Sequence, residues 1–75
     1  MSCTAMCNLA VGQSGTIERV GDTPFGERLV QVGFVPGERV CRAYSDAHGF
    51  LSAYRIGNTL IALRRPDARS VRVDI

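Results

Sequence analysis

Short runs of alternating apolar and polar residues dominate the chain and predict β-strands. The clearest run lies at the end, where Val71, Val73 and Ile75 share one face and polar residues lie between them. We expect further strands over residues 16–20, 38–44, 50–56 and 59–64, and the same period of two is clear in residues 50–56. Gly57 and Asn58 separate the last two of these runs, which indicates a two-residue hairpin turn.

One segment departs from this period and predicts a short helix over residues 24–32. Leu29 and Val32 are three positions apart, so they share one apolar helix face, which we expect in the core. Gly33 fits the left-handed residue that ends a helix, because it has no side chain to clash at positive φ. Phe34 then falls where its side chain can close over Leu29.

Turn-forming residues flank this helix at both ends. Thr23 is expected as the N-cap, with Pro24 at the first helical position, where a missing N–H is tolerated. Beyond the helix, Val35-Pro36-Gly37-Glu38 fits a type II turn, because proline presets φ at the second position and glycine accepts positive φ at the third.

Length and composition favour one small domain built from short strands. The chain has 75 residues, is 45% apolar, and contains eight glycines and three prolines. We expect a mainly β fold: a single domain over residues 1–75, forming a small SH3-like barrel of about five short strands with one inserted helix. Residues 1–8 are expected either as a loose lead or as a helical turn that docks through Leu9 and Val11.

Charge and cysteine content narrow the possible functions. The net charge of +2 is too small to indicate a nucleic-acid-binding protein, and all nine basic residues are arginine. Three cysteines do not make a disulfide framework, and the longest apolar run, 60–63, is too short to span a membrane. No sequence pattern for a nucleophile with its base, or for a phosphate loop, is present. These features favour a reduced, cytoplasmic protein that is not an enzyme.

The order of motifs resembles that of the ferrous iron transport protein A (FeoA) family. The matching segments are the glycine-bounded strand, the helix with its glycine stop and Pro-Gly turn, the hairpin strand and the last strand: residues 12–17, 28–40, 57–64 and 68–73. The resemblance implies a cytosolic SH3-like domain that assists the membrane ferrous iron transporter FeoB, whose cytosolic part includes a guanine-nucleotide-binding domain. It also implies a role in protein–protein contact rather than catalysis. The same unit occurs as the C-terminal domain of iron-dependent repressors.

The partner surface is predicted where the helix meets the Pro-Gly turn. Leu29 is expected mainly as a core residue, whereas an apolar side chain at a turn is easily exposed. The predicted partner-binding residues are Leu29, Phe34, Val35, Pro36 and Gly37.

A weak divalent metal site, for iron or zinc, is a second possibility. His48 is the only histidine, and with Asp46 and Cys41 it offers the ligand types that transition metals prefer. One histidine does not build a site within a monomer, so such a metal would bridge a homodimer. Cys3 and Cys7 could form half of a soft site if they shared a helix face.

The basic residues near the end of the chain leave one further alternative open. Four arginines gather there, at positions 64, 65, 69 and 72, and we expect a solvated face with salt bridges to Asp67 and Asp74. An acidic partner surface is the alternative. Small barrels of this class also bind RNA, but Tyr44, Phe50 and Tyr54 are not interleaved with these arginines.

Overall fold

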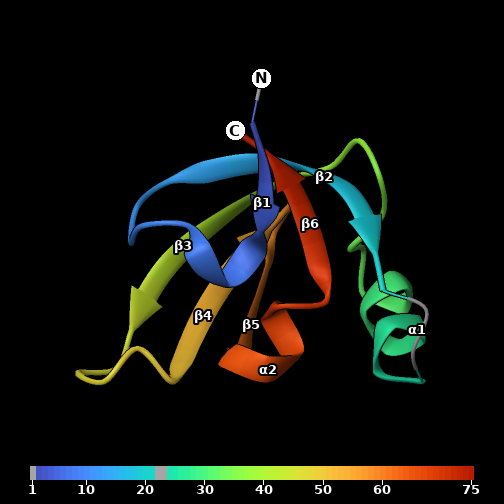
Figure 1. The fold of residues 1–75 in the computed structure, drawn as a ribbon. Helices are drawn as coiled ribbons and strands as arrows, with labels where there is room; N and C mark the ends of the chain where they lie inside the picture. Colours follow the sequence, from blue (N-terminus) through green and yellow to red (C-terminus); the bar gives the residue numbers. More distant parts are fainter. Residues whose placement is uncertain (1, 22–23) are drawn as a thin grey trace.

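The computed structural model describes residues 2–21 and 24–75. The strands are β1 (Cys3–Ala5), β2 (Ser14–Val20), β3 (Arg39–Ser45), β4 (Leu51–Ile56), β5 (Thr59–Arg64) and β6 (Val71–Asp74). The helices are the 3-10 turn η1 (Met6–Asn8), α1 (Pro24–Gln31) and α2 (Arg65–Ala68). Figure 1 shows α1 standing beside the sheet, in the connection between β2 and β3. The predicted N-cap, Thr23, lies outside the described residues.

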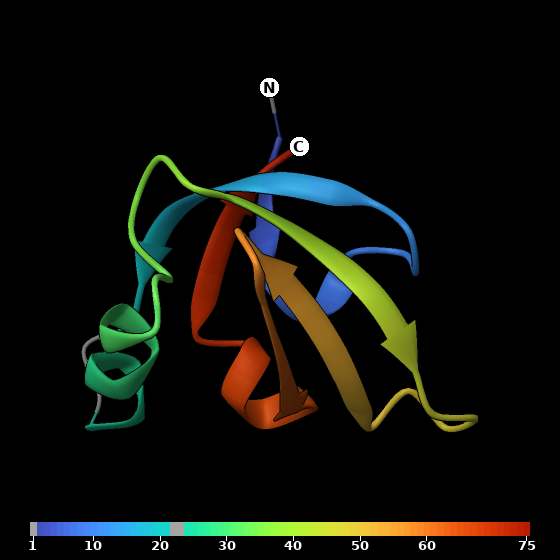
Figure 2. The same cartoon turned by 180° about the vertical axis from the view of Figure 1, so that it is seen from behind.

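In the described part of the chain, six strands form one antiparallel sheet in the order β1-β6-β2-β3-β4-β5. Both views show the sheet strongly curled, with β2 and β3 arching over the other strands (Figures 1 and 2). The prediction of a mainly β fold is confirmed, with one strand more than the five expected. The additional strand is β1, which pairs with β6 from Cys3↔Asp74 to Ala5↔Arg72. Its three residues are too few for a periodic pattern to show.

The N-terminal segment packs against the rest of the sheet. Of the two predicted alternatives, the helical turn is found, and Met6 and Cys7 within it are buried. Leu9 docks into the core as predicted, whereas Val11 is 56% exposed, which corrects that part of the prediction. The chain has already turned at Val11 and Gly12, so the Val11 side chain points away from the core.

The core lies inside the curl and draws side chains from almost every element. Its largest fully buried members are Tyr54, Phe34, Met6, Leu9, Ile17, Leu29, Val40, Val71 and Val73. The predicted inward face of the last strand holds for Val71 and Val73 but not for Ile75, which is 48% exposed because the strand ends at Asp74.

The end of α1 has the predicted glycine stop. Gly33 has a φ of 109°, and its N–H donates to the Val30 carbonyl oxygen at 3.1 Å. The Phe34 N–H donates to the Leu29 carbonyl oxygen at 2.9 Å, which completes a Schellman motif. The prediction that Val32 belongs to the core is wrong, because its side chain is 42% exposed. The chain reverses at Gly33, and Phe34 rather than Val32 packs beside Leu29.

No helix in the described part of the chain is long and apolar enough to cross a membrane.

Candidate partner-binding site

The segment after α1 forms the predicted type II turn. The Glu38 N–H donates to the Val35 carbonyl oxygen at 3.2 Å, and Gly37 has a φ of 94°. Two further backbone bonds of 2.8 Å fix the turn to β2, from the Gly37 N–H to the Ile17 carbonyl and from the Ile17 N–H to the Glu38 carbonyl. The turn is therefore held rigidly, both by its own hydrogen bond and by its two bonds to β2.

Burial divides the five predicted partner-binding residues into two groups. Pro36 and Gly37 are exposed and Val35 is half-buried, so these three can be reached by a partner. Leu29 is 1% exposed and Phe34 is fully buried, which corrects the prediction of partner contact for these two side chains. Both are needed in the core to hold α1 against the sheet.

The structure adds residues to this site that the sequence pattern did not reveal. A shallow hollow of about 300 Å³ lies between the end of α1, the turn and the tip of the β4–β5 hairpin. Its lining comes from Val32, Gly33, Val35 and Glu38 on one side and from Ile56, Gly57, Asn58 and Thr59 on the other. We call this surface, together with Pro36 and Gly37, the turn site. The Gly-Asn pair was predictable as a hairpin turn, but its proximity to Val35 depends on the folded sheet.

The predicted metal ligands are not brought together. The Asp46 carboxylate accepts the N–H groups of Phe50 at 2.9 Å and Leu51 at 3.3 Å, so it closes its own loop. His48 is exposed in that loop, and Cys41 lies near the other end of β3, roughly 13 Å along the strand. No group of three His, Cys, Asp or Glu residues in the described ranges could hold a metal ion. These residues therefore do not fit a metal site within one chain.

Cys3 and Cys7 do not share a helix face. Cys3 lies in β1 and is exposed, whereas Cys7 lies in η1 and is buried. All three cysteines are free. The spacing of four therefore does not form half of a soft metal site in this fold.

The C-terminal arginines are partly engaged in local contacts. Arg64 Nε lies 3.3 Å from Asp67 Oδ2, which confirms the predicted salt bridge to Asp67. Arg65 Nη2 donates to Asn8 Oδ1 at 3.5 Å, and Arg72 Nη2 donates to the Cys3 carbonyl at 3.4 Å. These two bonds attach the N-terminal segment to α2 and β6. In the part of the chain that the structure describes, no ion pair forms at Asp74.

A half-buried arginine that the sequence analysis did not single out joins three segments. Arg42 Nη1 donates to the Leu9 carbonyl at 2.6 Å, and its Nε and Nη2 donate to Ser52 Oγ at 3.1 and 2.9 Å. Nη2 also donates to Ser45 Oγ at 3.2 Å. All of these acceptors are neutral. Beside them, burial raises the pKa of the Tyr54 phenol, with Arg42 and Ser52 acting in the opposite direction.

Known proteins share this fold. At 30% identity, the zinc-complexed FeoA of Stenotrophomonas maltophilia matches with a TM-score of 0.85, over 92% of this chain and 87% of its own. That protein is described as a prokaryotic SH3 domain protein and a candidate activating factor for bacterial ferrous iron transport.

Two more distant structures support the fold alone. A FeoA-like protein from Clostridium acetobutylicum is 13% identical and has a TM-score of 0.89, over 100% of this chain and 88% of its own. A manganese-dependent transcriptional repressor is 16% identical with a TM-score of 0.84, over 96% of this chain and 41% of its own. The predicted SH3-like fold is confirmed by the match to the S. maltophilia protein, which is described as an SH3 domain protein.

The sequence comparison agrees with the structural one. No curated protein matches the chain significantly. The sequence profile of the FeoA domain, however, matches residues 4–75, which includes the helix stop, the Pro-Gly turn and every strand of the sheet except the first residue of β1. The chain therefore belongs to the FeoA family.

Proposed function

We propose that this protein is a cytoplasmic accessory factor of bacterial ferrous iron uptake, and that it acts by contact with the cytosolic part of the transporter FeoB. The observation that carries the proposal is the FeoA match over residues 4–75. The S. maltophilia relative, described as a candidate activating factor for ferrous iron transport, supports the same role. We propose contact rather than catalysis, because the turn site offers apolar side chains and backbone.

The turn site is the surface that we propose for this contact. Val32 and Val35 line its hollow, and Pro36 and Gly37 stand exposed beside it. Because backbone hydrogen bonds already fix the turn to β2, a partner would not have to order it on binding. A preorganised surface that exposes apolar side chains beside polar ones suits a protein partner.

The test is binding of the purified protein to the cytosolic part of FeoB, without nucleotide and with GDP or a non-hydrolysable GTP analogue. Val35→Asp should weaken binding at least roughly tenfold, because it places a charge in an apolar contact. Val11→Asp is the matched control, since Val11 is exposed far along the chain from this site. Circular dichroism checks that both variants fold. Absence of wild-type binding in every nucleotide state would reject the proposal.

A metal-bridged pair of chains is a second candidate, favoured by the zinc bound to the S. maltophilia relative. In this chain His48 is exposed and could ligate a metal together with residues of a second copy. Sedimentation velocity with zinc and with a chelator tests it, using His48→Ala as the comparison. If zinc leaves the monomer mass unchanged, or if His48→Ala associates equally well, the candidate is excluded.

A further inference from the structure

A β-bulge in β3 places Arg42 and Tyr44, which would share a face in a regular strand, on opposite faces of the sheet. The register to β4 shifts between Arg42↔Tyr54 and Tyr44↔Ala53, so one extra residue is accommodated there. After the shift, Ser45 faces inward, where its hydroxyl accepts the Arg42 bond. Tyr44 faces outward and is 55% exposed. The bulge therefore places an aromatic ring on the outer surface of the sheet.

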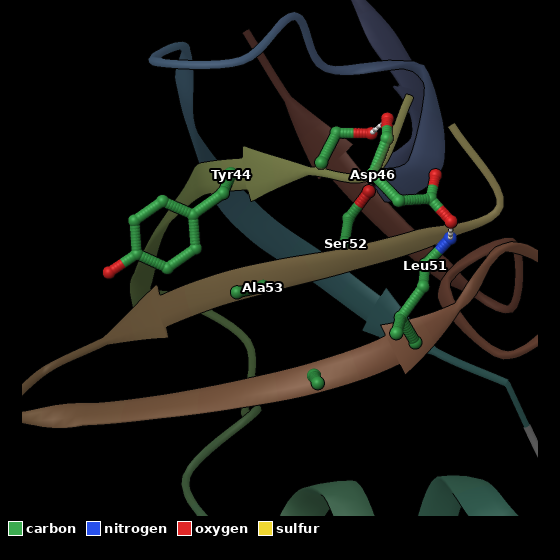
Figure 3. A pocket seen from close by; sticks show the side chains of 7 residues that line it. Tyr44, Asp46, Leu51, Ser52 and Ala53 are labelled. Carbon is green, nitrogen blue, oxygen red and sulfur yellow. Dashed lines mark hydrogen bonds between the residues drawn. The ribbon is translucent and has the colours of Figure 1, made fainter. Parts of the chain in front are cut away.

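That ring belongs to a continuous apolar surface on the outer face of β3, β4 and β5. Tyr44, Ala53 and Ala62 form one cross-strand row, and Leu51 and Leu60 lie in the rows on either side. We call these five residues the outer patch. Leu51 and Leu60 are 44% and 45% exposed. A shallow hollow of about 250 Å³ lies on the patch, and Figure 3 shows Tyr44 and Leu51 on opposite sides of Ala53.

The outer patch ends at a strand edge with no partner among the described residues. β5 is last in the strand order and pairs only with β4. In an antiparallel ladder, residue pairs that exchange backbone hydrogen bonds alternate with pairs that exchange none. The Arg65 N–H donates to the Phe50 carbonyl oxygen at 2.7 Å, so Phe50 and Arg65 form a hydrogen-bonded pair. Counting from that pair, Leu60, Ala62 and Arg64 belong to the pairs without hydrogen bonds, so their N–H and C=O groups point away from β4. The edge therefore presents unused backbone N–H and C=O groups at Leu60 and Ala62 and an unused N–H at Arg64, whose C=O caps the start of α2.

The charges beside this edge are positive. Arg55 and Arg64 both lie on the outer face, next to Leu60 and Leu51 in the register. Arg64 pairs with Asp67 through its Nε alone, so its two Nη groups remain available to a second carboxylate, and Asp46 accepts two backbone N–H groups of its own loop. A partner that covers the outer patch thus meets apolar side chains flanked by arginine, which favours apolar contacts combined with a carboxylate.

We propose that the edge of β5 accepts an extended segment of a partner protein as an additional antiparallel strand. The side chains of this segment on the outer face would be apolar opposite Leu60 and Ala62 and acidic opposite Arg64. Backbone hydrogen bonds to the edge would supply affinity, and the outer patch with its arginines would select the sequence. This surface is distinct from Val35, Pro36 and Gly37, so the proposal does not depend on the transporter contact.

The probe is the peptide Thr-Glu-Thr-Val-Thr-Val-Thr, whose second, fourth and sixth residues pair with Arg64, Ala62 and Leu60 in the antiparallel direction. Amide hydrogen exchange of the ¹⁵N-labelled protein is measured with and without it. We expect slowed exchange at the amides of these three residues. The matched peptide with lysine in place of glutamate should bind roughly tenfold more weakly, since an attraction becomes a repulsion.

Two variants make the result specific. Ala62→Pro removes the central edge N–H while leaving the bonds to β4 intact, and it should abolish protection. If that variant does not fold, Leu60→Asp decides, because it places a charge opposite the valine at peptide position six and should weaken binding. Unchanged exchange with the peptide, equal binding of the lysine peptide, or edge amides already protected by self-association would each overturn the proposal.

Discussion

The Phe34 backbone N–H donates to the Leu29 carbonyl oxygen at 2.9 Å, and both side chains are buried in the same core. One hydrogen bond thus ends α1 and sets the place where the chain re-enters the core. The turn site begins at the next residue, Val35, so its position follows directly from this pair.

Gly33→Ala should lower the free energy of unfolding by about 1 kcal/mol or more, because alanine is strained at a φ of 109°. Space is not the cause, since nothing lies within 4 Å of a Cβ placed at this position. Urea denaturation measures the loss. Val32→Ala is the control, as the neighbouring exposed side chain should change stability by less than roughly 0.5 kcal/mol. Equal effects of the two substitutions would contradict this account.

Gly26→Ala should destabilise the protein although alanine is the better helix former by roughly 1 kcal/mol. A Cβ at Gly26 would collide with the Gly21 carbonyl oxygen, a backbone atom that cannot rotate away. We expect a net loss of about 1–3 kcal/mol from overpacking, seen as a lower urea midpoint. Val30→Ala, at an exposed position of the same helix, should be close to neutral. A stabilised Gly26→Ala protein would show that α1 does not lie this close to the end of β2.

Arg42→Lys should cost about 1–3 kcal/mol, because lysine cannot reach the Leu9 carbonyl and the Ser52 hydroxyl together. The loss should appear in thermal unfolding and as faster hydrogen exchange around η1, which this bond attaches to the sheet. Arg55→Lys is the control, since Arg55 is exposed. If η1 exchanges at the wild-type rate in Arg42→Lys, the bond to Leu9 does not hold it.

Stability should fall at alkaline pH because of Tyr54. Burial raises the pKa of its phenol above the ordinary value of 10.0, so the unfolded chain loses this proton at lower pH than the folded protein. The contribution of Tyr54 is therefore fully present below pH 10 and is lost as the pH rises through the folded-state pKa. Urea denaturation between pH 8 and 11 measures it. The Tyr54→Phe protein should lose less stability over this range than Tyr44→Phe, in which the buried phenol remains.

The features that the sequence predicted correctly depend on local chemistry. Glycine and proline determine the backbone at Gly33, at the Val35–Glu38 turn and at the Gly57-Asn58 hairpin, so each is visible in a few neighbouring residues. Residue pattern and turn signals together identified every strand but β1, whose three residues are held by pairing with β6 rather than by their own pattern.

The predictions that failed concern features that only the contacts of the folded sheet determine. Helical spacing placed Val32 with Leu29, but the reversal at Gly33 gives that core position to Phe34 and leaves Val32 in the hollow of the turn site. The bulge that exposes Tyr44 and the network around Arg42 arise from residues far apart in the chain, and no local signal marks them. The two turns of the candidate site were therefore predictable one by one, whereas the approach of the hairpin tip to Val35 was not.

The pairing of the first and last strands has a mechanical consequence. The Ile75 N–H donates to the Ser2 carbonyl at 2.8 Å, and Cys3 lies opposite Asp74, so the two ends of the described chain meet at one end of the β1–β6 ladder. Tension between those ends would load the ladder bonds one after another, as in a zipper, instead of shearing them together. β1 would peel away at low force and release the segment through Leu9, and the curled sheet would resist only afterwards.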